Sequence, residues 1–148
     1  MIKKILNTEN NTVVFIARLT LGLVMFPHGA QKMLGLFGGY GFSGTMGFFT
    51  EQMGIPAVFA FLAIAAEFFG SLGLITGLLS RVAAFGIASV MTVAIFMGRL
   101  QNGFFMNWFG NQKGEGFEYH ILAIALALIV MIKGGGSLSI DAKLSKAK

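Results

Sequence analysis

Residues 56–79 read PAVFAFLAIAAEFFGSLGLITGLL, and Glu67 is the one ionisable side chain in this stretch. A helix needs about 20 predominantly apolar residues to span a bilayer, so the stretch is long enough to cross a membrane. Pro56 opens it, at a position that favours the first turn of a helix. The length and composition of the stretch therefore predict a transmembrane helix.

Three further apolar runs lie on either side of this helix in the sequence, at about 13–36, 82–100 and 117–133. The last two are short for a span, but long polar side chains at their ends can extend to the membrane surface. The pattern predicts an all-α integral membrane protein with four transmembrane helices in an antiparallel bundle. In this prediction residues 1–148 form a single membrane domain.

The composition agrees with a membrane location. Of the 148 residues, 55% are hydrophobic and 11% are charged, against about 25% charged in ordinary soluble domains. The net charge of +5 does not indicate nucleic-acid binding, because the basic residues form no stripe with interleaved aromatic residues. Cysteine is absent from the sequence, which excludes disulfides, thiolate metal sites and iron–sulfur clusters. Without cysteine, any redox role requires a quinone or a cofactor that is held by side chains without sulfur. From the high hydrophobic content, we expect the lipid bilayer as a partner.

The positions of the basic residues predict the orientation of the chain. Most of them lie near the two ends and in the turn after residue 79, whereas the other two loops hold few. Cytoplasmic segments carry the excess of lysine and arginine in membrane proteins. Both termini are therefore expected in the cytoplasm. The residues that carry this signal are Lys3, Lys4, Arg81, Lys133, Lys143, Lys146 and Lys148.

Two glycine motifs and an aromatic loop have simple structural interpretations. Residues 39–44, GYGFSG, match a dinucleotide-binding fingerprint, but that motif requires a preceding strand. Here it joins two predicted spans, which favours a flexible loop. Gly73 and Gly77 form a GxxxG motif, which favours close helix packing within the bundle, with a dimer face as the alternative. The aromatic residues between 104 and 109 favour an interfacial anchor over a lid.

Ionisable residues inside the predicted spans carry the functional argument. A charge at the bilayer centre costs from about 3 to over 10 kcal/mol, so it requires a partner or a function. On the first helix, Arg18 and Lys32 share a narrow face at helical spacing, with His28 at its edge. The helical rise places His28 and Glu67 at similar depths, where they are expected to meet. The residues expected nearer the outer surface are Lys32, Arg99, Glu118 and His120.

These residues form two predicted polar layers. In the inner layer, Asp141 is expected to form a structural ion pair with Arg81 or Arg18. The outer layer is expected to be a ligand-binding or proton-handling site, and the alternative is a purely structural network of ion pairs. Its members are His28, Lys32, Glu67, Arg99, Glu118 and His120.

Glu118 and His120 are not expected to face the same way. Side chains two positions apart on a helix point in directions that differ by about 200° around its axis. His120 shares its face with Ala123 and Ala127 and is expected to point inward. Glu118 points inward only if the helix begins after it.

The sequence argues against haem and against a metal ion. Helical bundles hold such groups through side chains on facing helices. Haem would require both His28 and His120, whose expected depths differ by several ångströms. No HxxH or ExxH spacing supports a metal site. The sequence assigns no cofactor, and a quinone is one candidate.

Six short motifs resemble signatures of the DoxX family. They are distributed along nearly the whole chain. They are RLTLG at 18–22, HGAQK at 28–32, EFFG at 67–70, GLLSR at 77–81, GFE at 116–118 and GSLSID at 136–141. The resemblance implies a small four-helix inner-membrane protein of bacteria or archaea. The founding members of that family are subunits of a thiosulfate:quinone oxidoreductase, and others accompany membrane oxidoreductase assemblies.

The leading hypothesis is a subunit of a membrane quinone-linked oxidoreductase, which binds a quinone or a small anionic substrate in the outer half of the bundle. The predicted ligand-binding residues are His28, Lys32 and Arg99. The predicted proton-handling residues are Glu67, Glu118 and His120. The alternatives are a small-solute or proton transporter or channel, and a non-catalytic membrane anchor or scaffold. An oxidoreductase partner subunit and a homo-oligomer are compatible with these hypotheses.

Overall fold

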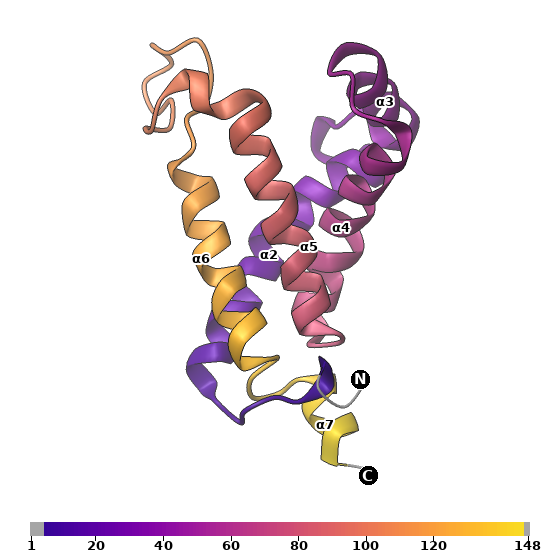
Figure 1. The fold of residues 1–148 in the computed structure, drawn as a ribbon, viewed down its shortest axis with the longest axis vertical. Helices are drawn as coiled ribbons and strands as arrows, with labels where there is room; N and C mark the ends of the chain where they lie inside the picture. The colour runs from indigo at the N-terminus through magenta and orange to yellow at the C-terminus, as the bar shows by residue number, and fades with distance from the viewer. Residues whose placement is uncertain (1–4, 147–148) are drawn as a thin grey trace.

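Four long helices dominate the structure. The computed structural model describes residues 5–146, and within that range it contains helices and turns but no strand. The long helices are α2 (Thr12–Leu34), α4 (Ala57–Thr76), α5 (Ser80–Ala94) and α6 (Glu118–Lys133). Figure 1 shows the first and last described segments together at one end of these helices. We call this the terminal end, and we call the opposite end, which carries residues 35–56 and 103–117, the loop end.

Short elements connect the long helices. Between α2 and α4 the chain forms η1 (Leu36–Gly38), α3 (Gly41–Gly47) and the π-helical turn η2 (Phe48–Gln52). After α5 the helix continues through a π-helical turn, η3 (Ile95–Arg99), and the 3-10 turn η4 (Leu100–Asn102). A last short helix, α7 (Ile140–Lys146), lies beyond the bundle at the terminal end (Figure 1).

Three helical segments are long and apolar enough to cross a membrane. They are Thr12–Leu34, Ala57–Thr76 and Ser80–Asn102, which confirms the prediction for the first three apolar runs. The fourth run is helical as α6, but α6 has 16 residues, slightly fewer than the roughly 17–25 of a typical span. The fourth span and the cytoplasmic termini stay predictions. Three lysines of the topology signal, Lys3, Lys4 and Lys148, lie outside the described residues.

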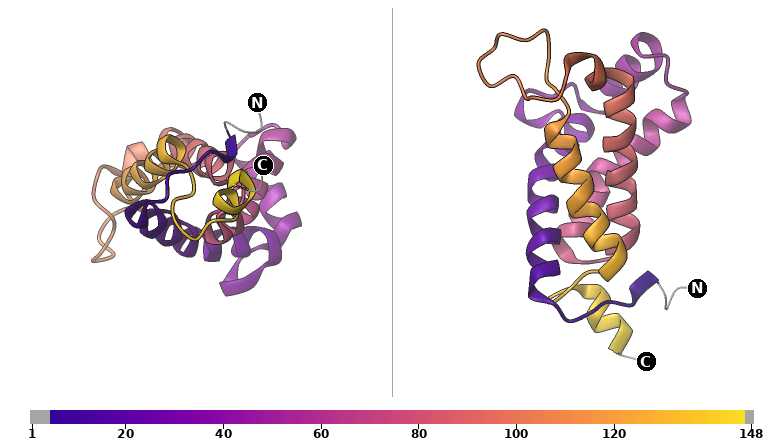
Figure 2. Two further views of the ribbon diagram at one scale, coloured as in Figure 1. Left: turned by 90° about the horizontal axis from the view of Figure 1, so that it is seen from below. Right: turned by 60° about the vertical axis from the view of Figure 1, so that its left-hand side comes forward.

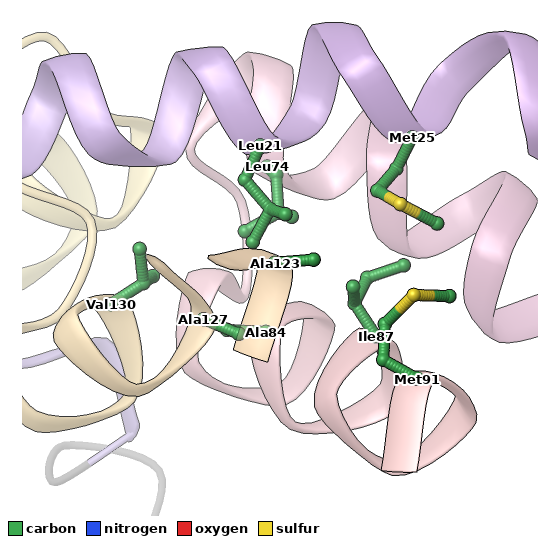
Figure 3. Close-up of a cluster of buried hydrophobic side chains, with 9 residues drawn as sticks. All are labelled: Leu21, Met25, Leu74, Ala84, Ile87, Met91, Ala123, Ala127 and Val130. Atoms are coloured by element: carbon green, nitrogen blue, oxygen red, sulfur yellow. The ribbon is translucent and has the colours of Figure 1, made fainter. Parts of the chain in front are cut away.

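The long helices pack in a ring that follows their order along the chain. The most extensive contact joins α2 to α4, the contacts of α5 with α6 and with α4 come next, and a smaller α2–α6 contact closes the ring (Figure 2, left). Methionines and branched or small aliphatic side chains fill the centre (Figure 3). The buried cluster consists of Leu21, Met25, Leu74, Ala84, Ile87, Met91, Ala123, Ala127 and Val130.

The outer surface of the bundle is strongly apolar. Phe59, Phe85 and Phe96 are 62%, 60% and 72% exposed on α4, α5 and η3. A continuous apolar surface of this kind is unfavourable in water but suits the hydrocarbon region of a bilayer. The exposed phenylalanines therefore agree with a multi-pass membrane protein.

Glycines set the close approach of α2 to α4. A Cβ atom added to Gly29 would lie 2.7 Å from the backbone of Glu67 and Phe68, and one added to Gly22 would lie 2.9 Å from the backbone nitrogen of Ile75. Helix backbones in membrane proteins approach this closely only where small residues face each other. The contact fixes the register of α2 against α4, and this register determines which polar side chains meet.

The GxxxG motif of α4 also packs inside the chain. Gly77 ends α4 in a left-handed conformation with φ of 72°, which favours glycine. A Cβ atom there would collide with Ser139 and would lie 3.1 Å from the guanidinium carbon of Arg18. Gly73 similarly faces Leu78 and Ala83. The motif therefore serves packing within the chain, as its first interpretation predicts.

Candidate functional site

A buried ion pair joins α2 to α4 in the half of the bundle nearer the loop end. The Nζ atom of Lys32 lies 2.5 Å from Oε2 of Glu67. The Glu67 side chain is only 4% exposed, and that of Lys32 is 26% exposed. Opposite charges at this distance, away from water, attract each other strongly, although part of the gain offsets the cost of desolvation. Glu67 therefore has a fixed partner.

That partner differs from the one that helix depth predicts. His28 was expected to meet Glu67, but His28 is exposed on the surface of α2, and Lys32 reaches the carboxylate instead. The reason is side-chain length, because the four-carbon stem of lysine allows its ammonium group to lie about one helical turn away from its own Cα. His28 lies four residues before Lys32, one turn of α2 away from the ion pair.

Three neighbouring rings connect α2 to α6 beside the ion pair. The ring of Tyr119 lies 6.0 Å from the ring of His28 and 5.5 Å from the ring of His120. The Tyr119 hydroxyl donates to Sδ of Met25 at 3.2 Å, and a thioether is a weak acceptor. Tyr119 was absent from the sequence-based site. Its signal was its position directly before a histidine at the start of an apolar run.

His120 is the least satisfied polar side chain of the site. It is 7% exposed, which agrees with the inward orientation predicted for it. Its Nδ1 atom is buried and has no hydrogen-bond partner among the described residues. Buried polar atoms are nearly always paired, and an unpaired one costs about 1–3 kcal/mol. This buried nitrogen therefore has unused hydrogen-bonding capacity.

Arg99 and Glu118 border the site at the loop end. Arg99 ends η3 and is half-buried. Glu118 is the first residue of α6, so the condition for it to point inward is not met. Its carboxylate accepts a hydrogen bond of 3.3 Å from Nε1 of Trp108 in the neighbouring loop. The structure thus leaves Glu118 with the aromatic loop.

At the terminal end, Arg18 binds the backbone of two segments. It is fully buried, and its guanidinium donates to the carbonyl oxygens of Leu74 and of Ile75, the latter at 3.0 Å, in the last turn of α4. It also donates to the loop after α6, at 2.6 Å to Gly135 and at 3.4 Å to each of the carbonyl oxygens of Ser137 and Leu138. Carbonyl groups at a helix C-terminus lack helical partners, and a cation stabilises them.

Asp141 binds backbone N–H groups at the start of α5, whereas Arg18 binds carbonyl groups at the end of α4. Its two carboxylate oxygens each accept a hydrogen bond of 2.8 Å, from the backbone N–H groups of Leu79 and Ser80. These are free donors at a helix N-terminus, where a carboxylate is favourable. Asp141 is 1% exposed, so the cap is shielded from water. A residue from the end of the chain thereby caps a helix that begins 61 positions earlier.

The ion pairs expected for Asp141 are therefore not formed. Arg81 donates to the backbone carbonyl oxygens of Asn7, Met131 and Ile132, and Arg18 donates to the carbonyls described above. Within residues 5–146, the salt bridges are Lys32–Glu67 and Lys133–Glu9. The prediction of direct pairing was wrong because unpaired backbone groups at helix ends compete for the same charged side chains.

The described part of the chain contains no group of three His, Asp or Glu side chains placed to hold a metal ion. The structure brings Lys32 together with Glu67, and it brings the rings of His28 and His120 next to that of Tyr119. Chemically, this arrangement offers one buried charge pair, hydroxyl and imidazole hydrogen-bonding groups, and one unpaired nitrogen.

These features define a multi-pass, all-helical membrane protein with a polar site inside an apolar bundle. The chain belongs to the DoxX family, because the family model described as DoxX matches residues 13–100, more than half of its length. His28, Lys32, Glu67 and Arg99 lie inside the matched region, whereas α6 lies after it. Comparisons with curated proteins and with solved structures gave no match.

Proposed function

We propose that this DoxX-family protein is a redox-linked subunit of the inner membrane of a bacterium or archaeon, and that it binds a quinone or a small anionic substrate. The binding site is the polar cluster near the loop end. The single observation that carries the proposal is the buried, unpaired Nδ1 atom of His120, whose ring lies next to that of Tyr119. A fold that tolerates such an atom without a partner gains stability when a ligand supplies one.

The loop end has a proposed orientation in the membrane. With four spans and cytoplasmic termini, the loop end faces away from the cytoplasm. The basic side chains of Arg81, Lys133 and Lys143 at the terminal end support this orientation. The ligand is then bound in the outer half of the bundle.

The residues have separate proposed roles. Lys32 and Arg99 provide positive potential for a carbonyl oxygen or an anion. Glu67 and His120 exchange protons, which quinone reduction and oxidation require. His28 lies at the exposed edge and connects the site to the surface. Glu118, held by Trp108, is the outermost proton-handling candidate.

A binding titration with a matched set of variants tests the proposal. The purified protein in detergent is titrated with a ubiquinone or menaquinone analogue and, separately, with thiosulfate. We expect saturable binding to the wild type, weakened at least tenfold by Lys32→Met and by Glu67→Gln. The exposed loop residues Lys113 and Glu51 supply the controls, because Lys113→Met and Glu51→Gln make the same chemical changes away from the cluster.

Thermal unfolding of each variant separates lost binding from lost folding. His120→Phe removes the unpaired nitrogen without breaking a hydrogen bond, so it should abolish binding while the protein stays folded. Wild-type protein that binds neither a quinone nor thiosulfate would contradict the proposal. Solute or proton flux into liposomes containing only this chain would support transport instead. If Lys32→Met, Glu67→Gln and His120→Phe each impair only assembly with a partner subunit, the scaffold alternative is supported.

A further inference from the structure

The short helix α7 is anchored to the turn between α4 and α5. The carboxylate of Asp141, in the first turn of α7, accepts hydrogen bonds of 2.8 Å from the N–H groups of Leu79 and Ser80. The N–H group of Asp141 donates to the carbonyl oxygen of Gly77 at 2.9 Å. α7 therefore begins where α4 ends and α5 starts, at the terminal end of the bundle (Figure 1).

This anchor places α7 at a surface of the membrane. α4 has 20 residues and is therefore about 30 Å long, which equals the thickness of the hydrocarbon core of a bilayer. The polar head groups form a further layer of about 5–8 Å on each side of that core. α7 has 7 residues, which correspond to a length of about 10 Å. Most of α7 therefore lies within the layer of lipid head groups.

Three large apolar side chains at α7 are exposed. Leu138, Ile140 and Leu144 are 79%, 38% and 45% exposed. Leu138 lies just before α7 and has φ of 52°, a left-handed conformation that is strained for leucine. Packing within the described chain does not explain a leucine at this position, because most of the residue is exposed. Ile140 and Leu144 are four positions apart and so lie on one side of the helix. A surrounding lipid layer would cover all three side chains.

The exposed charges on α7 are positive. Lys143 and Lys146 are both exposed. Within residues 5–146, the acidic side chains at the terminal end are those of Glu9 and Asp141. Glu9 pairs with Lys133 at 3.1 Å, and Asp141 is buried as the cap of α5. Neither neutralises the two lysines of α7, so its exposed surface attracts anions.

We infer that Leu138 and α7 form a docking surface for anionic phospholipids of the leaflet at the terminal end. The apolar side chains enter the boundary between head groups and acyl chains, and Lys143 and Lys146 bind the phosphate groups. An acidic protein would match the charge as well, but the depth of α7 and its exposed apolar side chains favour lipid. The surface contains no residue of the polar cluster near the loop end, so this inference is independent of the proposed function.

Two lipids with the same acyl chains and different head groups test the inference. The full-length protein in mild detergent is titrated with phosphatidylglycerol and, separately, with phosphatidylcholine, and native mass spectrometry counts the lipids bound at each concentration. We expect the wild-type protein to bind phosphatidylglycerol at least about tenfold more tightly. A basic residue near an anionic surface contributes about fivefold in affinity, so Lys143→Gln and Lys146→Gln should each reduce this preference about fivefold. Lys113→Gln makes the same change in the exposed loop at the other end and should alter the preference less than about twofold.

A glycine variant separates lipid binding from folding. Glycine adopts a positive φ without strain, so Leu138→Gly should leave the melting temperature unchanged or raise it. The same variant removes an apolar side chain from the lipid boundary and should weaken phosphatidylglycerol binding about fivefold. Phe37→Gly is the matched control, because Phe37 is also exposed, at 66%, and has φ of 51°, but lies at the loop end. It should leave phosphatidylglycerol binding unchanged.

Three results would overturn the inference. The first is equal affinity of the wild-type protein for the two lipids, which would favour an acidic protein as the partner of α7. The second is a preference for phosphatidylglycerol that persists when Lys143→Gln and Lys146→Gln are combined. The third is a folded Leu138→Gly protein that binds phosphatidylglycerol as tightly as the wild type does. Each of these results would leave the ligand site near the loop end unaffected.

Discussion

Replacing Gly29 by alanine tests the register of α2 against α4. The added Cβ atom would lie 2.7 Å from the backbone carbon and oxygen of Glu67 and from Cα of Phe68. Carbon atoms in favourable contact are about 3.5–4.0 Å apart, so the two helices must separate locally by about 0.8 Å or more. No side chain can rotate away, because the obstructing atoms belong to the backbone.

The expected magnitude follows from two opposing effects. Overpacking a tight contact costs about 1–3 kcal/mol. Alanine in place of glycine in a helix interior contributes about 0.5–1 kcal/mol of stability. The net loss is therefore about 0–2.5 kcal/mol with a midpoint of about 1 kcal/mol, and for a chain of this size each kcal/mol lowers the melting temperature by about 2–4 °C. The separation should also lengthen the 2.5 Å contact between Lys32 and Glu67 and weaken ligand binding.

The assay is thermal unfolding in detergent, with Gly98→Ala as the matched control. Gly98 lies in the helical turn η3, and a Cβ atom there meets nothing within 4 Å. Gly98→Ala should therefore leave the melting temperature unchanged or raise it. A Gly29→Ala protein as stable as the Gly98→Ala protein would refute the close α2–α4 contact.

Three further substitutions test the polar layers, each by unfolding of the purified variant in detergent. Arg18→Met should cost about 1–3 kcal/mol for each buried carbonyl group of α4 and of the loop after α6 that it leaves unpaired. Arg18→Lys should lower the stability less, but it should not restore it fully, since an ammonium group cannot bind several carbonyls in a fork. Asp141→Ala should cost about 0.5–2 kcal/mol by uncapping α5, and Asp141→Asn, which keeps one acceptor, should cost less. Lys32→Met should cost about 3–5 kcal/mol by leaving the Glu67 carboxylate buried alone, and the double variant Lys32→Met/Glu67→Leu should recover most of that loss. Equal stability of the single and double variants, or of Asp141→Ala and wild type, would contradict these assignments.

Hydrophobic run length predicts the helices well, because a long apolar segment has few alternatives to a helix. The first three runs are found at nearly the expected boundaries. Periodicity also places Arg18 and Lys32 on the buried face of α2, since the glycines between them mark the side that touches α4. These features depend on local sequence and so can be derived from it.

The polar partners could not be derived in the same way. Depth along a helix places Cα atoms, but Lys32 meets Glu67 through the length of its side chain. Asp141 returns to the bundle as expected, but it binds the backbone N–H groups of Leu79 and Ser80 and not an arginine, because unpaired donors at the start of α5 compete for its carboxylate. Tyr119 belongs to the site because α6 lies beside α2, and that arrangement is set by tertiary packing.

Native mass spectrometry of the protein extracted from membranes in mild detergent tests the central claim most directly. The claim is that the cluster around His120 and the Lys32–Glu67 pair holds a ligand. Wild-type protein should carry an additional mass equal to that of a membrane quinone, and folded His120→Phe protein should not. Wild-type protein that carries no such mass, or His120→Phe protein that retains it, would contradict the account.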